Sequence, residues 1–301
     1  MATQDSLVQL YTKQHATSVE LALQIRDSRL ATRFMQGSHT GEMASPIDRI
    51  SPIEVREVSG RFEEIGRVEQ EYVRRWVRPR SFDLPVYVDS FDELKTSNDP
   101  KSALVESHRA AFERARDKVC VEAFFGSALI GKEGTETEAW SSFTGQVVGV
   151  DVGSTGATGL NVAKLRAARK ILKKNKVDLT YEELFIGINA EGDDDLLDEA
   201  MIVSKEYNID APIVNSKGVL ERFMGFTFVP FEDFQTDGSS YRRLPVWVKS
   251  GMHFGKWGSP TTDIMQDKTK KGYPWRVYGY DTFNATRRDP LKVVEIKISE
   301  A

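Results

Sequence analysis

The sequence predicts an α+β protein into which a smaller α/β unit is inserted. Three observations lead to this fold class. A long helix is expected over residues 100–128, strands and helices alternate from 147 to 235, and strands dominate residues 244–301. Strands near the end of the chain need earlier strands as partners, so the alternating part is expected to interrupt a discontinuous domain.

The first 52 residues are predicted to form an N-terminal arm. Residues 6–34 carry apolar side chains at helical spacing, but so few that this helix is expected to need a partner surface. Residues 36–52 are rich in Gly, Ser and Pro, which is typical of an extended linker.

Residues 53–81 are predicted to be an extended β-hairpin. Strand-like pieces flank Gly60 and Gly66, and dense charges of both signs leave too few apolar residues for a core. One interpretation is a solvated hairpin, whose exposed ion pairs contribute only ~0–1 kcal/mol each. The other, which we favour because an isolated hairpin is marginal in water, is an arm lying on a neighbouring subunit.

Charged side chains of this hairpin are the candidate inter-subunit contacts. Opposite charges that meet across an interface fix register, since mispaired like charges repel. The candidates are Arg56, Arg61, Glu63, Glu64, Arg67, Glu69, Glu71, Arg74, Arg75 and Arg78.

Residues 82–150 and 244–301 are expected to form one domain around the long helix. The segment 82–94 begins with alternating apolar residues, which indicates a half-buried strand. Asn98-Asp99-Pro100 supplies a cap and a first-turn proline for the helix 100–128, which would be ~40 Å long. Its apolar side comprises Leu104, His108, Phe112, Ala115, Val119 and Ala123.

Residues 151–243 are expected to form the inserted α/β unit. Its strands are predicted at 147–152, 184–188 and 225–231. Its helices are predicted at 160–175, 194–204 and 216–224.

The glycine-rich segment 149–160, GVDVGSTGATGL, raises the possibility of phosphate binding. It lacks the Lys of a Walker loop, and its first glycine pair is too widely spaced for a dinucleotide fingerprint. Asp151-Val152-Gly153-Ser154 does match the D-x-G-[ST] turn of sugar kinases and actin, although in that fold the turn opens the chain. We favour a flexible strand-to-helix connection in which Thr158 or Asn161 caps the helix.

Other catalytic or metal-binding patterns are not found in the sequence. None of the four histidines has a His or Cys at metal-ligand spacing, and no G-x-S-x-G motif is present. Asp193-Asp194-Asp195 lacks the spacing of a calcium loop and is interpreted as the solvated start of a helix. We therefore expect no catalytic residue, no cofactor and no metal.

The composition limits the possible partners and compartments. The chain has 301 residues, of which 40% are hydrophobic and 29% charged, and a net charge of −4. This charge gives no sign of bulk attraction to nucleic acid. A single cysteine, Cys120, fits a reducing compartment. With neither a signal peptide nor an apolar run near the ~20 residues that span a bilayer, the chain is expected to be cytoplasmic, or assembled in a cytoplasm, without a membrane.

The order of these parts resembles the major capsid protein of tailed bacteriophages, which has the Hong Kong 97-type fold. The segment FDLPVYVDSFDELKTSNDPKSALVESHRAAFERARDKVCVEAFFGSALIG is similar to that family's strand, spine helix and following small-residue segment. TGLNVAKLRAARKILKKNKVD resembles its first axial-domain helix, and VSKEYNIDAPIVNSKGVLERFMGFTFVPFEDF a later axial stretch. YGYDTFNATRRDPLKVVEIKI resembles the closing strand. The likeness covers roughly residues 50–301.

The resemblance implies a structural protein that assembles with itself. Hexamers and pentamers would form through an axial domain at 151–243, and they would build an icosahedral phage head around double-stranded DNA. The hairpin 53–81 (the E-loop) would lie over an adjacent subunit, and the arm 1–52 would reach a neighbour. A separate scaffolding protein, a portal and a possible decoration protein are implied partners, and the protein would reside in the virion after assembly in the host cytoplasm. The alternatives are an encapsulin-like compartment shell or a nucleotide-binding enzyme that uses residues 149–159.

Overall fold

The protein is described by a computed structural model that covers residues 27–50, 53, 55, 69–70, 72–88, 100–199 and 220–300. Its contacts divide the chain into two compact units. The first contains residues 81–114 and 259–281, and the second contains 28–80, 115–258 and 282–301. The long helix α3 (Pro100–Phe125) and strand β14 (Trp275–Arg287) run through both units.

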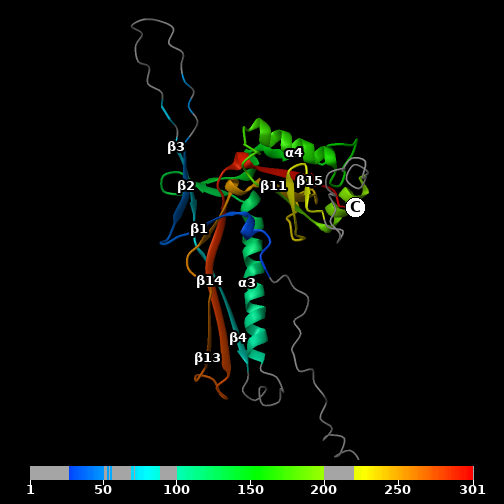
Figure 1. Cartoon of the computed structure of the whole chain (residues 1–301). Coiled ribbons are helices and arrows are strands. Elements are labelled where there is room, and N and C mark those ends of the chain that lie inside the picture. The colour runs from blue at the N-terminus through cyan, green and yellow to red at the C-terminus, as the bar shows by residue number, and fades with distance from the viewer. Residues whose placement is uncertain are drawn as a thin grey trace, which may run out of the picture. The chain divides into compact units, whose positions relative to one another are not determined.

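The first unit is built from strands around the first half of α3. β13 (Thr261–Gln266) and β14 pair antiparallel, from Thr261 opposite Tyr280 to Gln266 opposite Trp275, and run side by side in Figure 1. β4 (Arg80–Val88) also pairs with β14. In β4 the half-buried Phe82, Leu84 and Val86 alternate with exposed residues, which confirms the predicted half-buried strand.

Helix α3 confirms the prediction of one long helix over 100–128, with its end three residues earlier. Phe112, Val119 and Phe124 are buried along it, and Cys120 is fully buried among them. His108 is also buried, as the apolar spacing predicts. Gly126 follows the helix, and its N–H donates to Glu122 O at 2.9 Å.

A six-stranded sheet forms the centre of the second unit. Its order is β7-β15-β11-β8-β10-β9. The strands are β7 (Val147–Val148), β8 (Leu184–Ile188), β9 (Arg222–Phe223), β10 (Phe226–Pro230), β11 (Arg242–Val248) and β15 (Val293–Ile298). All residues of β8 are buried, as expected for a central strand covered on both faces. Helix α4 (Val162–Lys174) packs against β15 (Figure 1).

Two helices of this unit begin at asparagine caps. Asn161 precedes α4 and its side chain accepts a hydrogen bond from the N–H of Lys164, which confirms one of the two predicted caps. Leu165, Ala168 and Leu172, which are apolar residues at helical spacing, are all buried. Helix α5 (Ala190–Asp198) begins four residues before the predicted start, because Asn189 caps it. α5 ends at Asp198, and residues 200–204 of the predicted helix 194–204 lie outside the described residues.

The predicted helix 216–224 is wrong in its described part. Arg222 and Phe223 form β9, which pairs antiparallel with β10. The two residues between these strands, Met224 and Gly225, both have positive φ, 51° and 85°. Two residues of that kind form a type I′ turn, whose twist matches a β-hairpin. Residues 216–219 lie outside the described part.

Strands also replace the predicted linker at 36–52. β1 (Met35–Ser38) runs parallel to β12 (Met252–Lys256), which pairs antiparallel with the end of β14. β2 (Ala44–Ile50) pairs with β3 (Tyr72–Val77), so the hairpin begins at Ala44 rather than at 53. A bulge between Ala44 and Ile47 accommodates Pro46, which has no N–H for the ladder.

The shorter elements complete the described chain. A 3-10 turn, Ala31–Arg33, stands where helical spacing was expected to continue to residue 34. β5 (Ala128–Ile130) and β6 (Glu136–Glu138) extend the hairpin into a four-stranded sheet of order β2-β3-β5-β6. Further 3-10 turns span Trp140–Ser142, Thr144–Gln146, Lys249–Gly251 and Pro290–Lys292. No helix among the described residues is long and apolar enough to cross a bilayer.

The six-stranded sheet joins segments that the sequence assigns to different domains. β11 pairs with β8 on one side and with β15 on the other. β8 belongs to the predicted insertion 151–243, whereas β15 belongs to the tail. The sheet therefore crosses the predicted boundary at 243/244, because the closing strands are the partners that complete it.

Candidate assembly surface

The base of the charged hairpin is fixed by pairing on both sides of β3. On one side β3 pairs with β2, with Asp48 opposite Arg74. On the other side it pairs with the short β5, with Arg75 opposite Ile130. The base of the hairpin is therefore held in a sheet by strands on both sides of β3.

Arg75 anchors this base in the interior of its own chain. Its residue exposure is 4%, and its guanidinium forms an ion pair with Glu138 of β6. A buried charge needs such a partner, because desolvation costs several kcal/mol per ion. Arg75 also donates to the main-chain oxygen of Arg287, at 3.5 Å.

Arg287 of β14 ties the same cluster to the end of α3. Its guanidinium donates to Phe124 O at 2.9 Å and to Gly126 O at 3.0 Å, at the negative end of the helix dipole. The Trp140 ring lies 5.0 Å from the guanidinium carbon. Burial, and then the neighbouring Arg75, lowers the pKa of Arg287 to about 10, whereas Glu138 opposes this shift.

Trp140 extends the cluster toward the six-stranded sheet. Its indole N–H donates to Glu295 Oε2 at 2.5 Å. Glu295 is buried in β15 and also accepts two hydrogen bonds from Arg243 of β11, each at 2.8 Å. A continuous set of charged and aromatic side chains thus links the hairpin base to the sheet.

The N-terminal segment is held to α3 by one buried carboxylate. Asp117 is 1% exposed. It accepts hydrogen bonds from Ser28 Oγ at 2.6 Å, Arg29 N at 3.1 Å and Leu30 N at 2.9 Å. Phe34 follows and packs edge-on against Phe124, with the ring centroids 5.2 Å apart. The point at which the arm leaves the second unit is therefore fixed.

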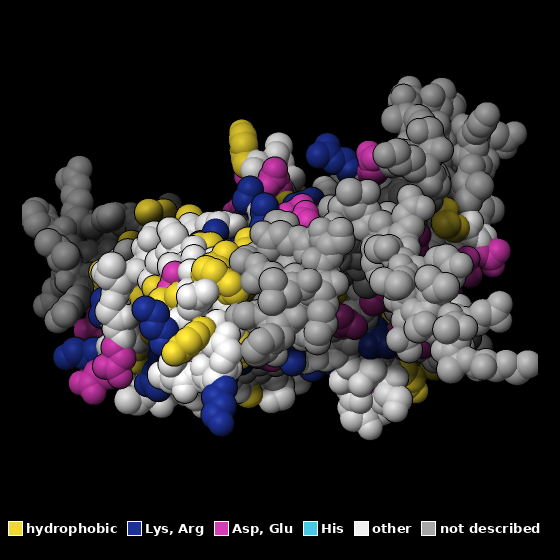
Figure 2. Space-filling model, turned by 90° about the horizontal axis from the view of Figure 1, so that it is seen from below, with side chains coloured by type: hydrophobic (Ala, Val, Ile, Leu, Met, Phe, Trp, Pro, Cys, Tyr) yellow, Lys and Arg dark blue, Asp and Glu magenta, His cyan; other side chains and the backbone are white. Residues whose placement is uncertain are grey.

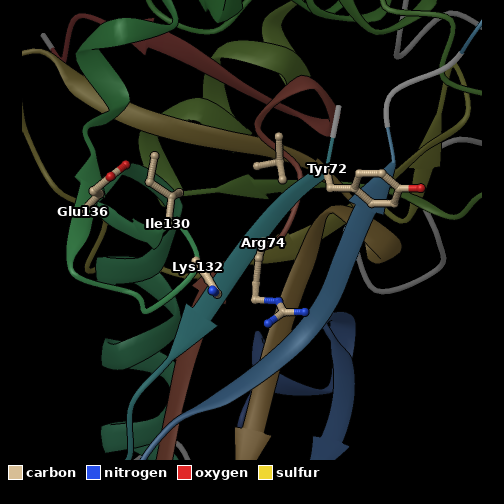
Figure 3. Close-up of a pocket in the computed structure, with 7 residues that line it drawn as sticks. Tyr72, Arg74, Ile130, Lys132 and Glu136 are labelled. Atoms are coloured by element: carbon tan, nitrogen blue, oxygen red, sulfur yellow. The ribbon is translucent and has the colours of Figure 1, made fainter. Parts of the chain in front are cut away.

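A pocket opens beside the hairpin base, where β5 ends. Its volume is about 500 Å³, and β3 and the β5–β6 hairpin line it. Figure 3 shows the Arg74 and Lys132 side chains on one side of β3, and Ile130 and Glu136 on the other. Tyr72, at the rim, is 67% exposed.

Several polar groups at the end of the glycine segment 149–160, and at the start of α4 after it, bind partners within the chain. The N–H of Leu160 donates to Asp195 at 2.8 Å, and the N–H of Val162 donates to Glu199 at 3.0 Å. The fully buried Lys164 donates to the carbonyl oxygens of Thr158 and Gly159, at 2.7 and 2.8 Å. Carboxylates thus stand where a phosphate would have to bind, which argues against the nucleotide-binding alternative.

The described histidines and the cysteine do not form a reactive centre. Burial, followed by the nearby Asp117, raises the pKa of the Cys120 thiol well above its ordinary value, which makes it a poor nucleophile. Within the described ranges no group of three or more His, Cys, Asp or Glu residues is placed to hold a metal ion.

The chain matches one protein family over nearly its whole length. A family model described as phage capsid protein matches residues 7–300. This chain belongs to the phage capsid protein family. No curated protein matches it in sequence.

Solved capsid structures share the fold of this capsid protein at low sequence identity. The capsid of cyanophage Pam1 has a TM-score of 0.75 at 12% identity, covering 99% of each chain. The capsid of cyanophage P-SCSP1u has a TM-score of 0.72 at 10% identity, covering 97% of this chain and 94% of that one. The capsid of Ralstonia phage GP4 has a TM-score of 0.68 at 13% identity, covering 97% and 96%. The predicted Hong Kong 97-type fold is confirmed, and the protein is a major capsid protein of the virion.

The candidate contact residues of the capsid protein fall into two groups, those that the structure describes and those that it does not. Glu69, Arg74, Arg75 and Arg78 are described, and of these Arg75 faces the interior of its own chain. Arg78 is exposed, and its guanidinium donates to Gly134 O at 3.3 Å. Arg56, Arg61, Glu63, Glu64, Arg67 and Glu71 lie outside the described residues.

Sequence reasoning missed the residues that fix the arm and the hairpin. Asp117, Glu138 and Arg287 are charged residues in segments that read as surface or strand. Their partners lie far away in the sequence, as with Arg75 and Glu138, which are 63 residues apart. The one signal for Asp117 is its helical spacing, since it lies three residues before Cys120 and seven before Phe124, both of which are buried in α3.

Proposed function

We propose that this capsid protein assembles into the hexamers and pentamers of an icosahedral head that encloses double-stranded DNA. The observation that carries the proposal is the way in which the base of the charged hairpin is held in a sheet. Its base is held by the ion pair between the buried Arg75 and the half-buried Glu138, whereas the segment between Ile50 and Tyr72 is dense in charge and too poor in apolar residues for a core. A rigid base with charged residues beyond it suits contact with an adjacent subunit.

The other parts are assigned as the sequence predicts. We infer that residues 151–243 make the axial contacts within each ring and that the arm 1–52 reaches a neighbour. Residues 82–150 and 244–301 are then the peripheral domain, apart from β11 and β15, which complete the six-stranded sheet with β8. Each contact can be weak, because many symmetric contacts act together.

The charge distribution favours confinement of DNA over tight binding. Lys and Arg side chains are interspersed with Asp and Glu over the described part of the face in Figure 2. The net charge of the chain is −4. Sequence-independent DNA binding needs many cationic side chains that are not neutralised by nearby acids. The shell is therefore proposed to enclose DNA without binding it tightly.

Further partners and the site of assembly belong to the same proposal. A separate scaffolding protein, a portal and a possible decoration protein would act with this subunit in the host cytoplasm. The protein itself is proposed to catalyse no reaction. An encapsulin-like shell is the second candidate, and the family match to phage capsid proteins favours the phage head over it.

Charge reversal in the hairpin tests the proposed inter-subunit role. Arg74→Glu and Glu63→Arg are each expected to reduce the yield of particles seen by electron microscopy, while circular dichroism of the unassembled protein is unchanged. Arg74→Lys and Glu63→Asp keep the charge and serve as matched controls. Normal shells from both reversed variants would contradict the role of the hairpin charges.

The nucleotide-binding alternative has its own test. Isothermal titration with millimolar ATP and Mg²⁺ should give no binding heat. Binding that disappears in a Gly153→Val variant would instead support a nucleotide site at 149–159.

A further inference from the structure

Helix α4 lies in a segment whose charges all have one sign. Residues 152–177 contain seven Lys and Arg residues and no Asp or Glu, although the whole chain has a net charge of −4. One of the seven, Lys164, is fully buried and donates to two main-chain oxygens. Every exposed residue between 162 and 176 belongs to the same set, and these are Arg166, Lys170, Lys173, Lys174 and Lys176.

Most of these cations form a stripe along one side of α4. Residues three and four apart lie on the same side of a helix. The members with this spacing, which we call the α4 stripe, are Arg166, Arg169, Lys170, Lys173 and Lys174. At 1.5 Å per residue the stripe is ~12 Å long. The opposite side, with Leu165 and Leu172, is buried because α4 packs against β15 (Figure 1), so the stripe faces away from the sheet.

The charges of the α4 stripe are not neutralised within the part of the chain that the structure describes. There, none of its five members forms an ion pair or a side-chain hydrogen bond, and the Nε of Arg169 is buried without a partner. The carboxylates of Asp195 and Glu199 bind main-chain N–H groups before the stripe begins. Lys170 lies four residues from both Arg166 and Lys174, and like charges at this spacing destabilise a helix. An anion outside the subunit would remove this repulsion.

The helix dipole accounts for only part of the stripe. Lys173 and Lys174 stand in the last turn of α4, where cations interact favourably with the negative end of the dipole. Arg166, Arg169 and Lys170 lie before that turn, where this effect has faded. A purely structural role therefore leaves three of the five cations without an explanation.

The stripe fits a partner that has dense negative charge and needs no apolar contact. Protein interfaces have an apolar centre and few lysines, whereas every exposed side chain between 162 and 176 is charged. A basic helix binds a lipid surface by inserting its apolar face, but that face of α4 is buried against β15. Double-stranded DNA carries one phosphate charge per ~1.7 Å of its axis and binds Lys and Arg without any apolar contact.

We propose that the α4 stripe contacts the backbone phosphates of the double-stranded DNA that the shell encloses. The inference rests on the proposed function, since it requires a head that contains DNA, and it puts α4 on the inner side of the shell. Each stripe binds weakly and without sequence preference, because a few cations meet phosphates only. Many copies act together, so the contacts guide the outermost DNA along the wall while no single subunit binds it tightly.

Salt-dependent DNA binding by the unassembled full-length subunit tests the stripe. Fluorescence anisotropy is measured with a labelled duplex of about 20 base pairs at NaCl concentrations between about 50 and 200 mM. One variant combines Lys170→Gln, Lys173→Gln and Lys174→Gln. Each lost phosphate contact lowers the slope of log affinity against log salt by about 0.9, so this variant should lose roughly 2 to 3 of that slope.

Two further variants separate the stripe from the overall charge. The matched control removes three exposed lysines elsewhere, Lys118→Gln, Lys132→Gln and Lys271→Gln, and should keep nearly the whole slope. A combined Lys→Arg variant at 170, 173 and 174 keeps the charge and should bind like the parent protein. Equal losses in the stripe variant and the matched control, or a parent subunit that does not bind the duplex at low salt, would overturn the inference.

Amine labelling of assembled heads tests whether the stripe meets the DNA. Empty and DNA-filled particles are treated with a small acetylating reagent, and each lysine is quantified by mass spectrometry. We expect Lys170, Lys173 and Lys174 to be acetylated several-fold less in filled particles than in empty ones. The three control lysines should be acetylated to the same extent in both kinds of particle.

Each other labelling result decides against the inference. Low acetylation of the stripe in both kinds of particle would mean that a second copy covers it, as would a lower yield of empty shells from the stripe variant than from the matched control. High acetylation in both would mean that the stripe faces outward, toward an acidic protein. Shells with such labelling would overturn the inference alone. A parent chain that forms no shells would overturn the proposed function, and the inference with it.

Discussion

Arg75 of β3 forms an ion pair with Glu138 of β6, although β5 lies between their two strands. The ion pair spans β5 within the four-stranded sheet, at the base of the charged hairpin. The ion pair therefore helps to hold the base of the hairpin, whose own sequence has too few apolar residues for a core. Arg287 lies beside it and extends the same cluster to the end of α3.

Removal of Arg75 should destabilise the unassembled subunit. Arg75→Ala is expected to lower the free energy of unfolding by about 2 kcal/mol, less than the ~3–5 kcal/mol of a fully buried pair. The expected loss of stability is smaller than for a fully buried pair because the Glu138 side chain is 27% exposed and Arg287 is near. Urea denaturation measures the difference, and the exposed Arg78→Ala should change it by no more than about 0.5 kcal/mol. Equal effects of both variants would rule out the anchoring role.

Removal of Asp117 should release the start of the arm. Asp117→Ala leaves the N–H of Leu30 buried without its partner, which costs about 1–3 kcal/mol. Hydrogen exchange at Leu30 should therefore become faster, while exchange within β8 stays slow. Lys118→Ala, at the next and exposed position, is the control. Unchanged exchange at Leu30 would show that Asp117 does not hold the segment.

Acid should weaken the subunit through its histidines. Burial, then His39 and Arg288, lowers the pKa of His253 from 6.5 to about 4, and burial lowers the pKa values of His39 and His108. The unfolded chain then binds more protons below pH 6.5, so stability is lost as the pH falls from 6.5 toward 4. For His253 alone the loss is on the order of 3 kcal/mol.

Urea midpoints at pH 7 and pH 5 measure this acid effect. His253→Gln should show a smaller change between the two pH values than the parent protein. His253 Nε2 lies 2.8 Å from His39 Nε2, so protonation of both rings would also break their hydrogen bond. An identical pH dependence in the variant would contradict the assigned origin.

Lys164 should give a response of the same sign, at alkaline pH. Burial lowers its pKa from 10.5 to about 8, with Asp195 and Asp151 opposing the shift. The unfolded chain therefore binds the extra proton between pH 8 and 10.5, and stability relative to a Lys164→Met variant should rise over that range. Denaturant unfolding of both proteins at pH 7.5 and 9.5 measures the difference. A parent protein that loses stability relative to the variant would show that the ammonium is not desolvated.

Elements with strong local signals were predictable from the sequence. α3 and α4 have apolar residues at helical spacing, α4 also begins at the Asn161 cap, and β8 is a short apolar run in which every residue is buried. β4 shows the period of two along its half-buried face. Such patterns depend on neighbours in the chain, which a single sequence contains.

Elements defined by distant partners were not predictable. Residues 222–223 sit in a helix-like run, yet a positive-φ turn at Met224-Gly225 makes them a strand. β1 and β2 lie in a Gly-, Ser- and Pro-rich stretch and become strands because β12 and β3 pair with them. The residues that anchor the hairpin base were not predictable for the same reason, since Glu138, the partner of Arg75, lies 63 residues away in the sequence.

Electron microscopy of the purified protein, with size-exclusion chromatography beside it, tests the central claim most directly. We expect closed shells, or rings of five and six subunits, in which the hairpin of each subunit lies over its neighbour. Co-expression with a candidate scaffolding protein should raise the yield of closed particles. A protein that stays monomeric under both conditions would contradict the assignment as a shell-forming subunit.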